Sequence, residues 1–593
     1  MGLTCVLPVV YRAAMSVQEQ RNANDTSTSR SHSALKATGD VPAGLLAAAT
    51  AGVYVLIARS HGALGASRND DWAYYRMSFR LANEGVLELN GWAQMMFVGH
   101  AILAWPIVVL FGPDITALQL MVCSVGAVGL WAAHQIVRSF LPRHWSIFAT
   151  GCLAIGPVYG SLSVSFMTDV PAFTLQSLSL LAGLRALRSA NTSVPWFAVS
   201  LILGFAAFSI REYSLAAGLS VSCVVIVNAW RRNARYARPF FAMAAGWLAA
   251  CVSLYVWRST LSNSIVTSLD LTPRALAGSL RTTWRAALTL GLFVAPAVAV
   301  AAPGKLLVSV WIRARTGAAI VILASVAATT LSRATYIGNY FTIHGSYPVT
   351  LPGSSPTVVS RPIWWVLQIV SVLSTTALIL HVLMWWTDRR SVPSPHPEPS
   401  KNNSPLPPGW VLTAVFVAWT LVIALGVVIG TDSPFFDRYL IVIVPFVAAL
   451  AIRTALDRQL LGRTTRFVAL AALGGLGVLG FTIVDAAATF DGAKWRLAQD
   501  VERMGYEAST IDGGFEWFAF HQPDNISSST QPPGTSIWIT MFSDRLVCVT
   551  SAFEETDEDG DVSNHGQLVQ HIWAVSSTGV DYRLLALAGP DSC

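Results

Sequence analysis

The chain has 593 residues, of which 53% are hydrophobic and only 12% are charged, with a mean hydropathy of +0.52. Soluble domains carry about 25% charged residues, so this chain cannot clothe a soluble surface and lipid must be its main solvent. The net charge of +6 is modest. Because the arginines stand in short loops between apolar segments, the charge indicates membrane topology and argues against a nucleic-acid partner.

The first 40 residues are polar, rich in Ser, Thr and Asn, and are predicted to be disordered. Apolar segments follow, each close to the roughly 20 residues that span a bilayer. The candidates are Val41–Ala58, Gln94–Phe111, Ile115–Val137, Ser146–Ser163, Val170–Leu187, Trp196–Ile210, Ser214–Trp230, Phe240–Trp257, Ala286–Ala302, Gly317–Leu331, Ile363–Trp386, Trp410–Gly430, Leu440–Ile452 and Phe467–Val484.

Arginine-rich loops orient these segments, because cytoplasmic loops carry an excess of Lys and Arg. The loop 230–239 holds four arginines and is placed in the cytoplasm. Alternation from there puts the segment after Val484 outside. A cytoplasmic amino terminus then requires an odd number of crossings, so one early candidate does not cross. We expect this to be Ser146–Ser163, which Gly156 and Pro157 interrupt, although Arg138 and Arg143 then lie outside.

The predicted fold is therefore an all-α polytopic membrane protein with about 13 transmembrane helices over residues 41–484. The polar gaps 59–93 and 332–362 become outer loops. Carboxylates concentrate on that outer side, whereas the apolar segments hold few ionisable groups beyond three histidines expected to be packing residues: His100, His134 and His381. Transporters usually carry charges near mid-membrane, so this pattern favours an enzyme working at the outer face.

Residues 485–593 are predicted to form a small outer domain, α/β or mostly β. The expected strands are Ser536–Phe542, Arg545–Thr550, Ile572–Val575 and Tyr582–Leu587. The acidic stretch Glu554–Asp561 matches no calcium loop and is interpreted as a solvated turn. Cysteines in the apolar segments are expected to be inert, whereas Cys548 and Cys593 could pair in an oxidising compartment.

Short motifs on the predicted outer face carry a family resemblance. Asp70-Asp71 in the first outer loop, followed by Tyr74 and Tyr75, resembles the carboxylate pair of polytopic GT-C-type glycosyltransferases that use polyprenyl-phosphate sugars. Protein O-mannosyltransferases and the lipid A aminoarabinose transferase are members. Further similar segments are Thr168-Asp169-Val170-Pro171, Asp437-Arg438-Tyr439-Leu440 before Pro445, and Ile511–Trp517. One departure is that Trp92-Ala93-Gln94 stands where aminoarabinose-type members carry Lys-Pro-Pro.

The resemblance implies sugar transfer from a polyprenyl-phosphate donor to an acceptor hydroxyl, with inversion. Asp70 is the expected general base and Asp71 the second choice, and the alternative for both is capping of an interfacial helix over Trp72–Ala82. Arg438 is the first candidate to bind the donor phosphate, and its alternative is an ion pair with Asp437 or Asp432. No cofactor is expected, although a divalent metal ion would be compatible.

The remaining candidates are weaker. Arg211 could bind phosphate, but an ion pair with Glu212 is the favoured alternative, and Asp169 could instead cap its helix. The outer loop 332–362 could cover the acceptor, or its aromatics could form an interfacial belt. Its candidates are Arg333, Tyr336, Tyr340, His344 and Tyr347.

Two rival functions remain open. A transporter or flippase of lipid-linked saccharides would also need outer aromatics, but it would not depend on one outer carboxylate. A non-catalytic scaffold or sensor would depend on its C-terminal domain. The sequence does not determine the sugar, the oligomeric state, or whether the acceptor is a protein, a glycolipid or a polysaccharide.

Overall fold

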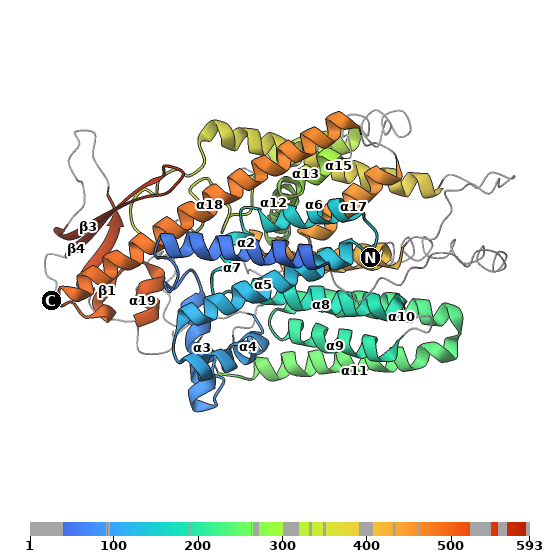
Figure 1. The fold of residues 1–593 in the computed structure, drawn as a ribbon, viewed down its shortest axis with the longest axis horizontal. Helices are drawn as coiled ribbons and strands as arrows, with labels where there is room; N and C mark the ends of the chain where they lie inside the picture. The colour runs from blue at the N-terminus through green and yellow to red at the C-terminus, as the bar shows by residue number, and fades with distance from the viewer. Residues whose placement is uncertain are drawn as a thin grey trace.

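The structure is a computed structural model. It describes residues 40–90, 92, 95–188, 193–262, 264, 272–300, 319–330, 335–347, 351–390, 407–430, 435–458, 462–521, 547–554 and 566–588. Long helices lie side by side, and a small sheet stands beyond one end of them (Figure 1). We call this the site end.

The regular elements in the first half of the described chain are all helices. Its elements are α2 (Val41–Ser60), α3 (Asp71–Glu84), α4 (Val98–Phe111), α5 (Ile115–Val137), α6 (Arg143–Ala154), α7 (Tyr159–Ser163), α8 (Asp169–Arg188), α9 (Val194–Phe208), η2 (Glu212–Ser214), α10 (Leu215–Arg232), α11 (Ala234–Ser259), α12 (Pro273–Phe293) and α13 (Ala295–Val300).

The second half adds the long carboxyl-terminal helices and the strands. Its elements are α15 (Arg361–Arg390), α16 (Pro408–Gly430), η3 (Asp437–Val442), α17 (Val444–Asp457), α18 (Arg463–Arg503), η4 (Ala508–Thr510), β1 (Ile511–Asp512), α19 (Phe515–His521), β2 (Val549–Phe553), β3 (Gln567–Val575) and β4 (Asp581–Ala588).

Eight helices in the described part of the chain are long and apolar enough to cross a membrane: α2, α5, α8, α10 with η2, α11, α15, α16 and α18. Shorter apolar helices include α4, α9 and Ala319–Thr330. The chain is a multi-pass integral membrane protein, and the predicted fold class is confirmed. The number of 13 crossings stays a prediction.

The helix α8 lies at the centre of the bundle. Two of its buried hydroxyl side chains donate to neighbouring helices: Ser179 Oγ to Ser200 O at 2.8 Å, and Thr174 Oγ1 to Val125 O at 3.0 Å. By contrast, most of α11 is exposed on the bundle surface. A helix with an apolar exposed face is stable only against lipid, so α11 is a peripheral helix of the membrane domain.

The segment Ser146–Ser163 is broken as predicted, but it runs from one end of the bundle to the other. Arg143, at the start of α6, pairs with Asp40 before α2 at 2.9 Å, while α7 leads into Asp169 at the site end. The expectation that this segment fails to cross is therefore wrong. Gly480 of α18 packs on the break, where an added Cβ would clash with Ile155 O.

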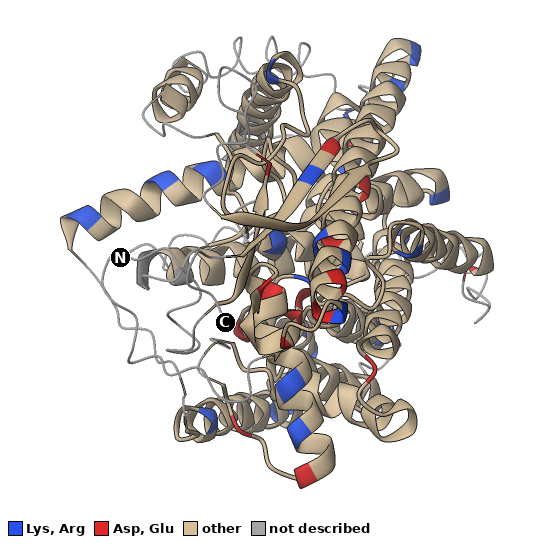
Figure 2. Ribbon diagram, turned by 90° about the vertical axis from the view of Figure 1, so that its left-hand side faces the viewer, with Lys and Arg blue, Asp and Glu red and all other residues tan. Residues whose placement is uncertain are grey.

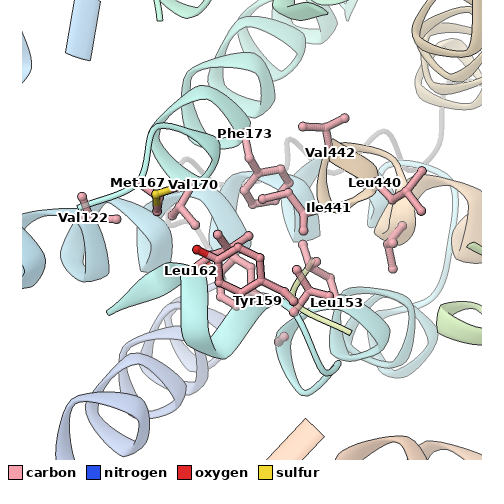
Figure 3. Packing of buried hydrophobic residues seen from close by; sticks show 14 of the residues in the cluster. Val122, Leu153, Tyr159, Leu162, Met167, Val170, Phe173, Leu440, Ile441 and Val442 are labelled. Atoms are coloured by element: carbon pink, nitrogen blue, oxygen red, sulfur yellow. The ribbon is translucent and has the colours of Figure 1, made fainter. Parts of the chain in front are cut away.

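Apolar side chains surround the irregular backbone between α6 and α7. Leu153, Tyr159 and Leu162 pack between α5, α8 and η3 (Figure 3). Their partners are Val122, Met167, Val170, Phe173, Leu440, Ile441 and Val442. Irregular backbone at this depth is tolerated because protein, rather than lipid, surrounds it.

The helix α4 begins and ends at the site end instead of crossing. At its start, the Phe97 amide donates to Ile210 O at 3.2 Å, and just beyond its end Pro113 O accepts from the Tyr75 hydroxyl at 3.1 Å. Thus Gln94–Phe111 is the early apolar segment that does not cross. Arg138 and Arg143 then lie at the same end as Asp40, which removes the objection that their charges raised.

The C-terminal domain has a four-stranded mixed sheet in the order β1-β2-β4-β3, with β1 and β2 parallel and the other pairs antiparallel. The predicted strands Ile572–Val575 and Tyr582–Leu587 lie within β3 and β4, and Arg545–Thr550 overlaps the start of β2. Ser536–Phe542 lies outside the described residues, as does most of the acidic stretch.

Cys548 is disulfide-bonded, and its expected partner Cys593 lies outside the described residues. Cys123, Cys152, Cys223 and Cys251 are free thiols.

Candidate active site

Two carboxylates and two arginines from distant parts of the sequence meet at the site end. Arg438 of η3 donates through Nη1 to Asp70 Oδ2 at 3.1 Å, and its Nε lies 3.9 Å from Asp169 Oδ2. Arg211 donates to the same Asp169 oxygen at 3.1 Å. The four charges therefore form one chain, Asp70–Arg438–Asp169–Arg211. Viewed from this end, acidic and basic residues gather near the middle of the molecule (Figure 2).

The Asp70 carboxylate is held by three side chains. Besides Arg438, the Trp92 indole donates to Oδ1 at 2.9 Å and the Tyr74 hydroxyl approaches Oδ2 at 3.4 Å. Asp70 occupies the N-cap position of α3, yet its side chain makes no capping hydrogen bond. The interfacial helix predicted over Trp72–Ala82 is confirmed as α3, but capping is not what the Asp70 carboxylate does.

Asp71 faces the opposite way, into the protein. It is fully buried, and Gln119 approaches its Oδ2 at 3.5 Å while its Oδ1 accepts no hydrogen bond from the described residues. Burial raises the pKa of this carboxyl to about 8. At neutral pH the group is then largely protonated, so Asp70 is the better placed of the two carboxylates to accept a proton.

The buried Asp71 should make stability depend on pH. Its folded pKa of about 8 exceeds the unfolded value of 3.8, so the folded state binds more protons between these values and loses stability as pH rises through that window. Asp71→Asn should remove this contribution. We expect the melting temperature of the variant to fall less than that of the native protein between pH 5 and pH 8. Equal slopes would contradict the raised pKa.

The two arginines are buried and flanked by aromatic rings. Arg438 stacks over Phe436 at 4.8 Å and Arg211 over Tyr439 at 5.4 Å, contacts that favour guanidinium over ammonium. Arg438 Nε donates no hydrogen bond within the described residues. Arg211 pairs with Asp169 rather than with the expected Glu212, and its Nε also donates to Thr168 Oγ1 at 2.6 Å.

The carboxylates beside these arginines, Asp437 and Asp169, accept hydrogen bonds from other parts of the chain. Asp437, the expected partner of Arg438, accepts the amides of Tyr340 at 3.0 Å and Phe341 at 2.6 Å instead. Burial raises the pKa of Asp437 to about 6. Asp169 accepts a hydrogen bond from the Tyr213 hydroxyl at 3.2 Å in addition to Arg211, so its carboxylate joins three segments of the chain.

The other predicted site residues divide into two groups. Tyr74 and Tyr340 reach the charged centre, because the Tyr340 hydroxyl accepts from Asn69 Nδ2 at 3.1 Å. Tyr336 packs in an aromatic cluster with Phe341 and Trp364. Tyr75 stacks on Phe79 and Phe520, and His344 approaches Pro356 O at 3.3 Å. Arg333 and Asp432 lie outside the described residues.

A second buried charge cluster was missed by the sequence reasoning. It joins the first loop to α18 and the C-terminal domain. Arg68 Nε donates to Asp491 Oδ2 at 2.7 Å, and the Tyr347 hydroxyl donates to the same oxygen at 2.8 Å. Lys494, one turn later, pairs with Glu516 at 2.6 Å. The sequence predicts that the last apolar segment ends at Val484 and that Asp491 and Lys494 belong to a separate domain. In the structure both residues lie on α18, which continues to Arg503.

Breaking this second cluster should destabilise the protein. Lys494 and Glu516 are both fully buried, so Lys494→Met leaves a buried carboxylate unpaired and should cost about 3–5 kcal/mol. Arg503→Met is the control on the same helix, because Arg503 pairs with Asp500 at the exposed surface and should cost less than about 1 kcal/mol. Thermal unfolding in detergent compares them, and similar losses would contradict the prediction.

No group of three or more His, Cys, Asp or Glu side chains within the described ranges is arranged to hold a metal ion.

Comparison with known proteins finds a family model that matches part of the chain. Residues 98–257 match the dolichyl-phosphate-mannose-protein mannosyltransferase family. The resemblance seen in the motifs is thereby confirmed over this segment, and so is the class of enzyme, a membrane glycosyltransferase using lipid-phosphate sugar donors. No curated protein matches the chain at a significant level.

Solved structures give weaker likenesses. ArnT from Cupriavidus metallidurans bound to undecaprenyl phosphate is 13% identical, with 92% of this chain and 99% of that chain covered and a TM-score of 0.35. The archaeal oligosaccharyltransferase AglB from Archaeoglobus fulgidus, in complex with an inhibitory peptide and a dolichol-phosphate, is 11% identical. It is covered over 64% of its length against 85% of this chain, with a TM-score of 0.42. Likenesses of this strength bear on no individual residue.

Proposed function

We propose that this glycosyltransferase transfers a sugar from a polyprenyl-phosphate donor to an acceptor hydroxyl at the site end, with inversion at the anomeric carbon. The observation that carries the proposal is the position of Arg438 between Asp70 and Asp169, at 3.1 and 3.9 Å. A cation for the leaving phosphate and a carboxylate for the incoming hydroxyl then belong to one site.

The reaction follows from these positions. The acceptor oxygen attacks the anomeric carbon on the face opposite the phosphate, and the bond from that carbon to the phosphate oxygen breaks. Polyprenyl phosphate leaves with the bonding electrons, while the hydroxyl proton passes to Asp70. The carboxylate also stabilises the oxocarbenium-like centre that develops during the displacement. The configuration at the anomeric carbon is inverted because only one displacement occurs.

Arg438 and Arg211 bind the donor phosphate in this proposal. The Nε of Arg438 donates no hydrogen bond to the residues that the structure describes, and guanidinium groups bind phosphate oxygens through paired hydrogen bonds. Asp169 holds the two arginines together, so its role is to position them. Trp92 stands where aminoarabinose-type relatives place Lys-Pro-Pro, and its indole supports Asp70 instead.

The site end is proposed to face the extracytoplasmic side. Four arginines surround the junction of α10 and α11, at the bundle end opposite Arg211 and Arg258: Arg231, Arg232, Arg235 and Arg238. A cytoplasmic position for that junction puts the C-terminal domain outside. The acceptor, whether protein, glycolipid or polysaccharide, would approach from there.

The direct test is sugar transfer by purified protein from polyprenyl-phosphate-linked mannose and arabinose, using a mixture of acceptors. Free polyprenyl phosphate released from the donor is the readout. Release by the native protein and its loss in Asp70→Asn supports the proposal. Movement of intact donor across vesicles without release would instead support the transporter alternative.

A further inference from the structure

Asn69 adopts a left-handed backbone conformation that is unusual for a residue other than glycine. Its φ is 52°, in the left-handed region, and only three non-glycine residues in the described chain have positive φ. The other two are Phe97, which stacks on Tyr74, and Tyr347, which binds Asp491. Asn69 and Phe97 therefore lie beside the charged centre, and Tyr347 lies in the second charge cluster. Non-glycine residues in this region cost about 1–3 kcal/mol and persist where surrounding structure holds them.

The side chain of Asn69 is held as firmly as its backbone. Its Nδ2 donates to the Tyr340 hydroxyl at 3.1 Å, and Tyr340 is fully buried. Asparagine tolerates the left-handed region better than other side chains except glycine. The residue thus combines a special conformation with a specific hydrogen bond, immediately before the proposed general base.

These contacts close a ring around the site. Asn69 binds Tyr340, the Tyr340 amide donates to Asp437 at 3.0 Å, and the next residue, Arg438, returns to Asp70 at 3.1 Å. Two adjacent residues of the first loop are thereby tied to two adjacent residues of η3 through the loop 335–347. A ring of this kind fixes the distance between Asp70 and Arg438, because neither can shift without breaking the other links.

We infer that Asn69 and Tyr340 are a positioning pair for the transfer reaction, which sets the Asp70 carboxylate against Arg438. The inference rests on the proposed function of Asp70. Arg68 supports the same loop from its other side by binding Asp491, so Asn69 lies between an anchored arginine and the catalytic carboxylate. Neither Asn69 nor Tyr340 exchanges a proton with the substrate.

The test separates conformation from hydrogen bonding. Asn69→Ala removes both and should lower kcat about 10- to 100-fold, since misplacement of about 1 Å costs on the order of 100-fold. Asn69→Gly keeps the left-handed backbone and loses only the amide, so we expect a smaller loss. Tyr340→Phe should match Asn69→Gly. The double variant Asn69→Gly/Tyr340→Phe should have a kcat no lower than either single variant. The KM for the donor should stay within about threefold throughout.

The matched control is Tyr54→Phe, which removes a buried phenol hydroxyl bonded to Ala154 O, outside the ring. It should leave kcat unchanged. Additive losses in the double variant, or equal losses in Asn69→Ala and Asn69→Gly at unchanged melting temperature, would overturn the inference. Asp70→Asn is measured alongside. If Asp70→Asn is inactive while Asn69→Ala and Tyr340→Phe are fully active, only this inference fails, whereas an active Asp70→Asn refutes the proposed function itself.

Discussion

Replacing Asp70 with asparagine should lower kcat for sugar transfer by about 100- to 10,000-fold, the usual contribution of a positioned general base. Asparagine has nearly the same shape and retains one oxygen, which can accept from Arg438 or from Trp92, and Arg438 itself remains, so donor binding should survive. The measurement is steady-state kinetics with a polyprenyl-phosphate sugar, with kcat and the donor KM determined separately. We expect kcat to fall and KM to stay within about threefold.

Asp71→Asn is the control for this experiment. Since burial raises the pKa of Asp71 to about 8, its carboxyl is already largely uncharged at pH 7, and asparagine imitates that state. The variant should keep most of the native kcat. A large loss in Asp71→Asn together with full activity in Asp70→Asn would exchange the roles of the two residues. Full activity in both would remove the carboxylate mechanism.

The sequence determined the class of fold but not the path of every segment. Composition and hydropathy predicted a polytopic bundle because lipid solvation leaves a strong local signal. The sequence predicted that the α6–α7 segment does not cross, whereas in the structure it is α4 that does not, and this error had a physical cause. Both are apolar, but whether a segment crosses depends on where its ends bind. Those contacts, Phe97 to Ile210 and Arg143 to Asp40, join residues far apart in the chain.

The candidate site was predictable in part for the same reason. Asp70, Asp169 and Arg438 stood in motifs on one predicted face, and the structure brings them within hydrogen-bonding or ion-pairing distance. Their roles stay predictions. Nothing local indicated that Trp92 would bind Asp70, or that Asn69 would take a left-handed conformation. An asparagine between Arg68 and two aspartates was a weak signal for such a turn, because asparagine is enriched there.

Replacing Arg438 with glutamine should weaken the binding of the donor and slow its reaction. The change removes the positive charge that faces Asp70 and Asp169, and with it the charge-assisted hydrogen bonds offered to phosphate. Such bonds contribute about 1.5–3 kcal/mol each. Losing two should therefore lower kcat/KM by about 1,000-fold. Arg438→Lys keeps the charge but cannot bind in two places, so an intermediate loss is expected.

Product inhibition distinguishes two roles of Arg438, binding the donor phosphate and orienting Asp70. If the guanidinium binds the phosphate, inhibition by free polyprenyl phosphate should weaken in Arg438→Gln, whereas Asp70→Asn should retain it because the carboxylate repels rather than binds that group. If Arg438 only orients Asp70, both variants should lower kcat and both should keep the native inhibition constant. The first pattern supports a phosphate-binding arginine held next to the base by its ion pair. The second would leave Arg211, on the far side of Asp169, as the remaining described candidate for the donor phosphate.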